Sequence, residues 1–338
     1  MFNNDNERTL LPPNKDWYRD YIDTPANEVH KNESHQFVWT ASFGAKILAP
    51  LVKKYFRYDP SDRVWYQFDG IKWAETYGIH TVVMAALEDI KRRAGDNGPM
   101  QLVVGLSKIH NDKFDESVIR KLERSTTLHV RSSDFDKDIN LVNTPDGTYN
   151  LLTLEKHPNN PDDLCKKVTA VAPIDDGDGN DCPNYIKHLE FMADGKQKVK
   201  QFLEELSGLI CSGVTSYQQF YWFYGYRNNG KSVLANVWRY SLGDYACMGN
   251  QKQFAERYNS AHPEQEMRLE GVRYVFIDEL KGTKLDGAKL KSFTSGSPVV
   301  AREMHGNSKE FIPQCKILIA SNHKPAADAQ DGGLARRL

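Results

Sequence analysis

The sequence predicts an α/β protein with a parallel sheet and flanking helices, preceded by a mainly helical α+β domain. Three observations support this fold class. A glycine-rich loop at 225–232 stands between an apolar run and a helical pattern. Two further apolar runs downstream each end in polar side chains. From residue 184 onward strand and helix patterns alternate, which is typical of parallel strands joined by crossover helices.

The composition is that of a folded protein rather than a disordered one. Hydrophobic residues make up 40% of the 338-residue chain and charged residues 26%, enough for two domains with cores. No apolar stretch is long enough to span a bilayer and the start has no signal-peptide pattern, so we expect a cytoplasmic protein without a membrane partner. The formal net charge is −1, so nucleic acid would have to be bound by a local basic element.

The cysteines predict reduced thiols. There are five of them, an odd number, and none forms a C-x-x-C pair. This pattern argues against a disulfide framework and against a zinc site. The residues concerned are Cys165, Cys182, Cys211, Cys247 and Cys315.

Shifts in composition divide the chain into four segments. The polar, proline-containing start predicts a tail or linker, and a later stretch rich in Asp, Gly and Pro predicts a second linker. The predicted segments are a tail (1–33), an N-terminal helical and mixed domain (34–172), a linker (173–183) and a C-terminal α/β domain (184–338).

The N-terminal domain is expected to combine amphipathic helices with hairpins. Apolar residues at helical spacing predict a helix from about Gln36 to Phe56, interrupted near Pro50. An Asp-Gly pair between two aromatic runs predicts a hairpin at 64–73, and the Pro-Asp-Gly sequence at 145–147 predicts a turn between strands. Further helices are expected at 79–94 and 115–125, and in the later part of the chain at 184–193 and 196–212.

The loop at 225–232 fits the phosphate-binding pattern G-x-x-x-x-G-K-[ST] at every fixed position. The aromatic run Phe220–Tyr224 before it predicts a strand buried on both faces, and a helical pattern follows the loop. In this context backbone N–H groups turn towards phosphate oxygens at a helix N-terminus. Lys231 is expected to reach the β- and γ-phosphates, and Ser232 to ligate Mg²⁺. The residues predicted to bind ATP and Mg²⁺ are Gly225, Asn228, Asn229, Gly230, Lys231, Ser232 and Val233.

Two more strands are expected to end beside this loop. The run Arg273–Ile277 closes with two acids, of which Asp278 would hold Mg²⁺ through water and Glu279 would orient or deprotonate the attacking water. Two solvated acids at a strand end are common, and the loop upstream is what favours the catalytic role. The run Lys316–Ser321 closes with Asn322, whose amide can contact the γ-phosphate or the attacking water.

A basic hairpin is predicted between these two strands. Apolar ends around a Gly-Asn turn indicate a hairpin at 299–312. Its tip carries His305, with Arg302 and Lys309 nearby, and these three are the predicted contacts to DNA phosphates. The pair Arg336-Arg337 near the end of the chain can supply a finger for a neighbouring subunit's site, or is an ordinary basic pair.

The order of these motifs resembles that of superfamily-three helicases. The branch that it resembles most is the helicase module of phage and plasmid primases, which is shared with the poxvirus primase-helicase. The motifs that carry the resemblance are the loop at 225–232, LGDYA at 242–246, LEGVRYVFIDE at 269–279, the segment at 289–311, and ILIASNHKP at 317–325. A weaker resemblance covers the preceding domain through Trp65-Tyr66, Asp69-Gly70, Trp73, Phe135-Asp136 and 143–151.

The resemblance implies an AAA+-like motor that assembles as a homo-oligomeric ring, usually a hexamer, around DNA. ATP would be hydrolysed between subunits to drive translocation on single-stranded DNA and unwinding of forked DNA during replication. His305 and Lys309 would then be pore-loop residues, Asn322 a sensor, and Arg336 or Arg337 the finger. The implied catalytic set is Lys231, Asp278, Glu279, Asn322, Arg336 and Arg337.

Two parts of such a protein are missing from the sequence. Residues 1–33 are too few for a primase module, so primase activity is expected from a missing domain or a separate protein. The family usually continues beyond the arginine pair, so we expect a truncated C-terminal domain. An origin in a phage or other mobile element would place the protein in the host cytoplasm.

Two other classes of function stay open. A P-loop small-molecule kinase would need an acceptor pocket and an arginine-rich lid, and it has no use for the predicted basic hairpin. A replication-initiation ATPase or scaffold would use the nucleotide to control assembly without translocating. DNA-stimulated ATP hydrolysis distinguishes the motor from both.

Overall fold

The fold is described from a computed structural model of the chain. The residues described are 40–97, 111–174, 181–226, 228–250, 254, 266–278, 285–302, 308–322 and 332–338. The predicted tail at 1–33 lies outside them. The chain forms two compact units, with the boundary at residue 134 and with residues 70–72 assigned to the second unit. The linker predicted at 173–183 falls within the second unit.

In its described residues, the first unit packs three α-helices against a small antiparallel sheet. Its elements are α2 (Ala41–Tyr55), β1 (Phe56–Asp59), β2 (Val64–Phe68), β3 (Trp73–Thr76), α3 (Ile79–Asn97) and α5 (Asp112–Glu123). The Thr40 hydroxyl caps α2 by accepting a hydrogen bond from the Phe43 N–H at 3.1 Å. Strands β2 and β3 pair antiparallel around the Asp-Gly turn, which confirms the predicted hairpin. Helices α3 and α5 confirm the helices predicted at 79–94 and 115–125.

Helix α2 runs through Pro50, so the predicted interruption is wrong. Proline removes one backbone hydrogen bond and crowds the preceding turn, at a cost of about 3 kcal/mol. Ile47 and Leu48 before it and Val52 after it are all buried in the core of the unit. Packing of this apolar face on both sides of Pro50 offsets the local cost.

The second unit is built on a parallel sheet, as predicted, with four strands in the described residues. Its strands are β7 (Tyr221–Tyr224), β12 (Lys316–Ser321), β9 (Tyr274–Asp278) and β8 (Ala246–Met248), in the spatial order β7-β12-β9-β8. Every neighbouring pair is parallel. The C-terminal ends of β7, β9 and β12 therefore lie at one edge of the sheet, where binding crevices form in such folds.

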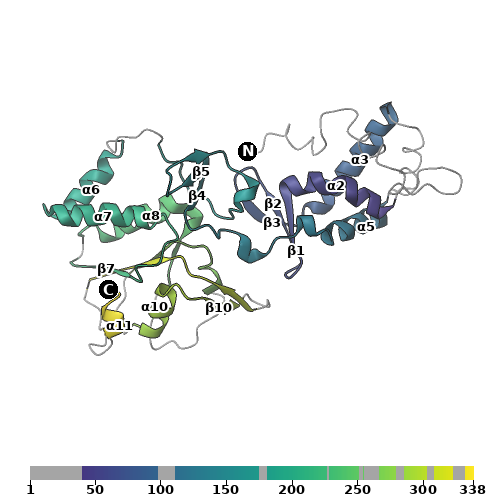
Figure 1. Ribbon diagram of the computed structural model, residues 1–338. Helices are drawn as coiled ribbons and strands as arrows, with labels where there is room; N and C mark the ends of the chain where they lie inside the picture. The colour runs from purple at the N-terminus through teal and green to yellow at the C-terminus, as the bar shows by residue number, and fades with distance from the viewer. Residues whose placement is uncertain are drawn as a thin grey trace. The chain divides into compact units, whose positions relative to one another are not determined.

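Helices cover both faces of this sheet (Figure 1). Tyr274 and Phe276 share one core with the helices α6 (Pro183–Ala193), α7 (Gln197–Leu209) and α8 (Lys231–Leu242). The alternate residues Val275 and Ile277 share a second core with the elements on the other face. Those elements are α10 (Gly287–Thr294), α11 (Gly332–Ala335) and the hairpin of β10 (Val299–Arg302) and β11 (Ser308–Phe311). The predicted hairpin and the predicted helices α6 and α7 are thus confirmed.

Strand β7 is not buried on both faces, so that prediction is wrong. It stands at one end of the sheet order. Its residues Tyr221, Trp222 and Phe223 are half-buried, and Tyr224 is 56% exposed. Aromatic residues are favoured on half-buried strands too, so the run alone does not separate an edge strand from a central one.

A second small sheet in this unit is tied to the first by one arginine. Its strands are β4 (Leu141–Thr144), β5 (Gly147–Asn150) and β6 (Lys156–His157), which confirms the predicted turn at 145–147. The buried Arg273 guanidinium donates to the carbonyl oxygens of Cys211 and Leu141, each at 2.6 Å. It also lies 4.4 Å from the Tyr245 ring centre. Because the hydrogen bonds are to a charged group, each is stronger than a neutral one.

Gly243 ends α8 where its backbone lies against the backbone of residues 168–170. Gly243→Ala is therefore expected to destabilise the protein. The residue has φ +55°, and an added Cβ would lie 2.6 Å from the Ala170 nitrogen and 2.7 Å from the Val168 oxygen. We expect a loss on the order of 2–4 kcal/mol in the free energy of unfolding, measured by urea denaturation. Gly208→Ala is the control, since nothing lies within 4 Å of its added Cβ in α7. Equal unfolding midpoints for the two variants would contradict the close approach.

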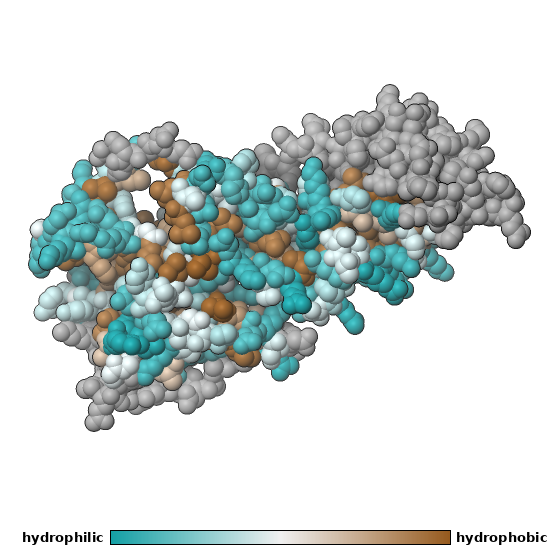
Figure 2. All heavy atoms as spheres, viewed as in Figure 1, coloured by the Kyte–Doolittle hydropathy of each residue, from teal (hydrophilic) through white to brown (hydrophobic). Residues whose placement is uncertain are grey.

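The surface of the second unit is uneven in polarity. Hydrophilic residues cover α6 and α7 in the face shown in Figure 2, and hydrophobic residues reach the surface over α8. Val233 and Val237 of α8 are 58% and 42% exposed, and Tyr240 is 65% exposed. Residues four or three apart lie on one face of a helix, so these three form an exposed stripe. Within the described ranges, no helix has the length and apolar character needed to cross a bilayer.

Candidate phosphate-binding site

The loop at 225–230 connects the end of β7 to the start of α8 and has the backbone of an anion cradle. Gly225 and Gly230 have φ +151° and +83°, and Asn228 has φ +60°. At Gly230 a side chain is also excluded by space, because a Cβ would lie 2.7 Å from His188 and 3.1 Å from the sulfur of Met192. The first turn of α8 follows this loop directly, with Gly230 as its N-terminal cap, and the N-terminus of a helix favours anions.

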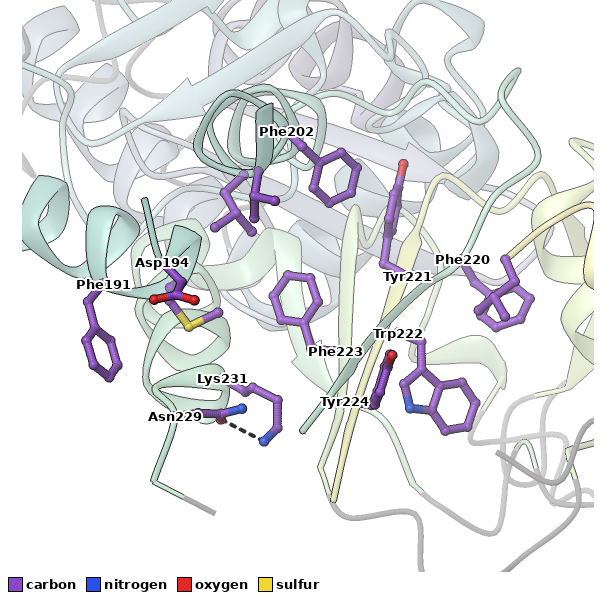
Figure 3. Close-up of a pocket in the computed structure, with 14 residues that line it drawn as sticks. Phe191, Asp194, Phe202, Phe220, Tyr221, Trp222, Phe223, Tyr224, Asn229 and Lys231 are labelled. Carbon is purple, nitrogen blue, oxygen red and sulfur yellow. Dashed lines mark hydrogen bonds between the residues drawn. The ribbon is translucent and has the colours of Figure 1, made fainter. Parts of the chain in front are cut away.

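The Lys231 ammonium is held inside this loop. It donates to the Gly225 and Tyr226 carbonyl oxygens at 2.9 and 3.0 Å and to the Asn229 side-chain oxygen at 2.7 Å. The last of these bonds is drawn in Figure 3. Burial lowers the pKa of Lys231, and the Asp278 carboxylate acts in the opposite direction. All three acceptors are neutral, so a phosphate oxygen that replaces one of them gains a charge-assisted bond.

A hydroxyl and a carboxylate meet beside the lysine, as the donor set for Mg²⁺ requires. The Ser232 hydroxyl, at the first turn of α8, donates to the Asp278 carboxylate at the end of β9, at 3.2 Å. Hard oxygen donors of this kind are what Mg²⁺ prefers, and it commonly retains waters as further ligands. The residues present thus fit the ion, with Ser232 and Asp278 as the groups that would hold it.

The third strand end completes a cavity of about 300 Å³. Its lining residues are Asn228, Asn229, Gly230, Lys231, Ser232, Val233, Asp278, Ala320, Ser321 and Asn322. Ser321 was not predicted as a site residue. Its hydroxyl accepts a hydrogen bond from the Trp222 indole at 2.8 Å, which ties the end of β12 to β7.

The remaining predicted residues lie away from this cavity or outside the described residues. Arg302 and Lys309 stand on β10 and β11, next to the hairpin tip. Arg336 and Arg337 follow α11, where both donate to the Gln218 side-chain oxygen, at 3.1 and 3.4 Å. The Arg337 carbonyl accepts from the Phe220 N–H, which places the pair at the end of β7 opposite the loop. Glu279 and His305 lie outside the described residues.

His188 supports the loop from a distant part of the sequence. This α6 residue places its Nε2 3.1 Å from the Gly230 carbonyl oxygen, and its ring lies 6.2 Å from that of Phe191. Sequence reasoning missed it, because a single histidine on an amphipathic helix gives no sign of the loop that it touches.

Comparison with protein families divides the chain into two parts. Residues 45–208 match the family described as D5 N terminal like. Residues 223–337 match a family of unknown function, DUF5906. The chain thus contains two domains that occur in phage and viral primase-helicase proteins. The resemblance inferred from the motifs is confirmed at this level.

Named relatives come from two viruses and a virophage. The chain is 23% identical over 300 residues to "Putative helicase L207/L206" of Acanthamoeba polyphaga mimivirus, with 81% of this chain and 31% of that protein covered. It is 24% identical over 249 residues to "Putative primase C962R" of African swine fever virus, with 69% and 25% covered. It is 28% identical over 144 residues to "Putative helicase V13" of Sputnik virophage, with 39% and 18% covered. The chain therefore spans at most about a third of these relatives' length.

One solved structure supports the fold. The apo C-terminal region of NrS-1 matches 87% of this chain and 60% of its own, with a TM-score of 0.50 and 14% sequence identity. At this identity the similarity concerns the fold alone.

Proposed function

We propose that the chain is the ATP-hydrolysing motor of a DNA replication helicase, with a P-loop NTPase domain of AAA+ type. The observation that carries this proposal is the meeting of Lys231, Ser232 and Asp278 at the C-terminal edge of the parallel sheet. A phosphate cradle next to a carboxylate at a neighbouring strand end suits hydrolysis of a triphosphate. The relatives named helicase and primase support a role in DNA replication.

Each residue of the cavity has a role in this proposal. Lys231 neutralises charge on the β- and γ-phosphates, and the N–H groups at the start of α8 hold the phosphate oxygens. Ser232 and Asp278 hold Mg²⁺, which when bound supplies positive charge that stabilises the transferred phosphoryl group. Asn322, which lines the cavity, contacts the γ-phosphate or orients the attacking water.

The proposed motor is a homo-oligomer, with a hexameric ring as the expected form. The stripe of Val233, Val237 and Tyr240 begins at the phosphate loop and is exposed. An apolar stripe of this kind favours coverage by another protein surface, here a second copy of the chain. Arg336 or Arg337 and the β10–β11 hairpin would then act on a neighbouring subunit's nucleotide and on single-stranded DNA. Primase activity would come from a domain outside this chain or from a separate protein.

DNA-stimulated ATP hydrolysis and unwinding of forked DNA test the proposal. We expect ATP hydrolysis that rises several-fold with single-stranded DNA, and rings in electron micrographs with an ATP analogue and DNA. ATP hydrolysis that DNA does not stimulate, without unwinding, would instead support a replication-initiation ATPase or scaffold.

Glu279→Gln is expected to separate nucleotide binding from hydrolysis. A neutral amide cannot take a proton from the attacking water, so turnover should fall by about 10²-fold or more while ATP affinity stays within a few-fold. ATP hydrolysis and equilibrium ATP binding are both measured. Glu204→Gln is the control, because that carboxylate is 45% exposed and takes part in a surface ion pair with Lys200. If Glu279→Gln hydrolyses ATP as fast as the unaltered protein, Glu279 does not orient or deprotonate the attacking water.

A further inference from the structure

A second and larger cavity lies beside the phosphate loop. Its volume is about 840 Å³, and it runs along β7 between the loop and the helices α6 and α7. Seven aromatic side chains line it: Phe191, Phe202, Phe220, Tyr221, Trp222, Phe223 and Tyr224. Figure 3 shows Phe191 and Asp194 at the end of α6 on one side and Tyr224 of β7 on the other.

This cavity and the phosphate-binding cavity share two residues. Asn229 and Lys231 line both of them. The Lys231 ammonium therefore lies between the aromatic side chains of the larger cavity and the phosphate loop. A ligand that fits both cavities has an anionic end and a flat, largely apolar body. The volume falls in the range of about 300–1,000 Å³ that is usual for pockets binding small organic ligands.

We propose that the aromatic cavity holds the nucleoside of the triphosphate, with Phe191 as a stacking platform for the base. The inference rests on the proposed function and extends it to the part of the nucleotide that the phosphate loop does not contact. Phe191 is 61% exposed, and its ring centre lies 6.2 Å from that of His188, which also contacts the loop at Gly230. An exposed aromatic face beside the phosphate loop offers a surface on which any base can stack.

Asp194 gives the same cavity a preference among bases. It is the C-terminal cap of α6, with φ +48°, and its carboxylate lines the cavity next to Phe191. An ionised carboxylate only accepts hydrogen bonds, so opposite the exocyclic group of a base it favours an amino group over a carbonyl oxygen. Adenine, guanine and cytosine carry such a group, and uracil does not. The structure thus assigns Asp194 as a specificity-determining residue.

Comparison of ATP with inorganic tripolyphosphate tests the role of Phe191. Equilibrium binding of each, with Mg²⁺, is measured by calorimetry for the full chain and for Phe191→Ala, Phe191→Tyr and Tyr77→Ala. Tyr77 is 99% exposed in the first unit and serves as the matched control. We expect Phe191→Ala to weaken ATP binding about tenfold, with tripolyphosphate binding unchanged. Phe191→Tyr should keep the ATP affinity, and Tyr77→Ala should change neither ligand.

The outcomes separate this inference from the proposed function. Equal affinity of the unaltered chain for ATP and tripolyphosphate, or equal weakening of both by Phe191→Ala, overturns the nucleoside pocket while the phosphate site stands. In that case the cavity is left to another occupant, such as an added strand of protein. If neither ATP nor tripolyphosphate binds to the unaltered chain, and Lys231→Ala changes the binding of neither, the proposed function is overturned as well.

Comparison of CTP with UTP tests the role of Asp194. Both are pyrimidine nucleotides, and the amino group of cytosine is replaced by a carbonyl oxygen in uracil. We expect CTP to bind about fivefold more tightly than UTP, and Asp194→Gly to remove the difference. Glycine is suited to the left-handed backbone of this cap, so the variant should fold normally. Equal binding of CTP and UTP by the unaltered chain contradicts the assignment.

Discussion

Lys231→Ala is expected to lower ATP hydrolysis by about 10²–10³-fold and, with it, DNA unwinding. The ammonium is the cation that the loop holds at its centre, with the carbonyl oxygens of Gly225 and Tyr226 as two of its acceptors. Loss of one positioned group that stabilises transition-state charge costs about 10²–10³-fold in turnover. Hydrolysis is measured as phosphate release with and without single-stranded DNA, and unwinding with a forked duplex.

The controls for Lys231→Ala concern folding and charge. Alanine leaves two loop carbonyl oxygens without this donor, so the unfolding midpoint is compared with that of the unaltered protein. Lys198→Ala removes an equal charge from an exposed position on α7 and should leave both activities unchanged. Unwinding that persists when hydrolysis is lost would falsify the motor hypothesis, since no other energy source is proposed.

Lys316→Met is expected to remove a pH dependence of stability. Lys316 begins β12, at the end of the strand opposite the phosphate site, and its side chain is buried. Its ammonium donates to the carbonyl oxygens of Ser212 and of Gln314. Burial, and then the charge of Arg273 nearby, lowers the pKa of Lys316 from 10.5 to about 7. The unfolded chain restores the ordinary pKa, so unfolding takes up a proton between these two values.

Because unfolding takes up a proton, raising the pH disfavours unfolding. The free energy of unfolding should rise with pH from about 7 towards 10.5, and Lys316 should contribute no pH dependence below pH 7, where both states are protonated. Between pH 7 and pH 9 the expected gain is roughly 2–3 kcal/mol. Urea denaturation at several pH values measures it, with Lys198→Met as the control. An identical pH dependence in Lys316→Met and the unaltered protein contradicts the prediction.

The sheet and the phosphate loop were predictable because their signals are local. The loop at 225–232 constrains its own backbone through glycines, and fully apolar runs such as Val275–Ile277 have few alternatives to a buried strand. Parallel strands end at the same edge, so the proximity of Asp278 to Ser232 followed from the order of the motifs.

The parts that could not be predicted depend on contacts between distant segments. The place of β7 at the end of the sheet is set by which strands pair, and its sequence is compatible with either position. The helix through Pro50 depends on the core that it joins. His188 and the buried Lys316 acquire their surroundings from residues far away in the chain, so neither differs from a surface residue in the sequence.

The hydrogen bond between Phe220 and Arg337 has a mechanical consequence. It joins the arginine pair to the start of β7, and the phosphate loop follows the end of the same strand. A strand of four residues is a stiff rod roughly 13 Å long. A displacement of the loop when its ligand changes would therefore be transmitted along β7 to the arginines, together with a shift of β7 against its partner β12. In the proposed homo-oligomer, one site would in this way signal its state to the next.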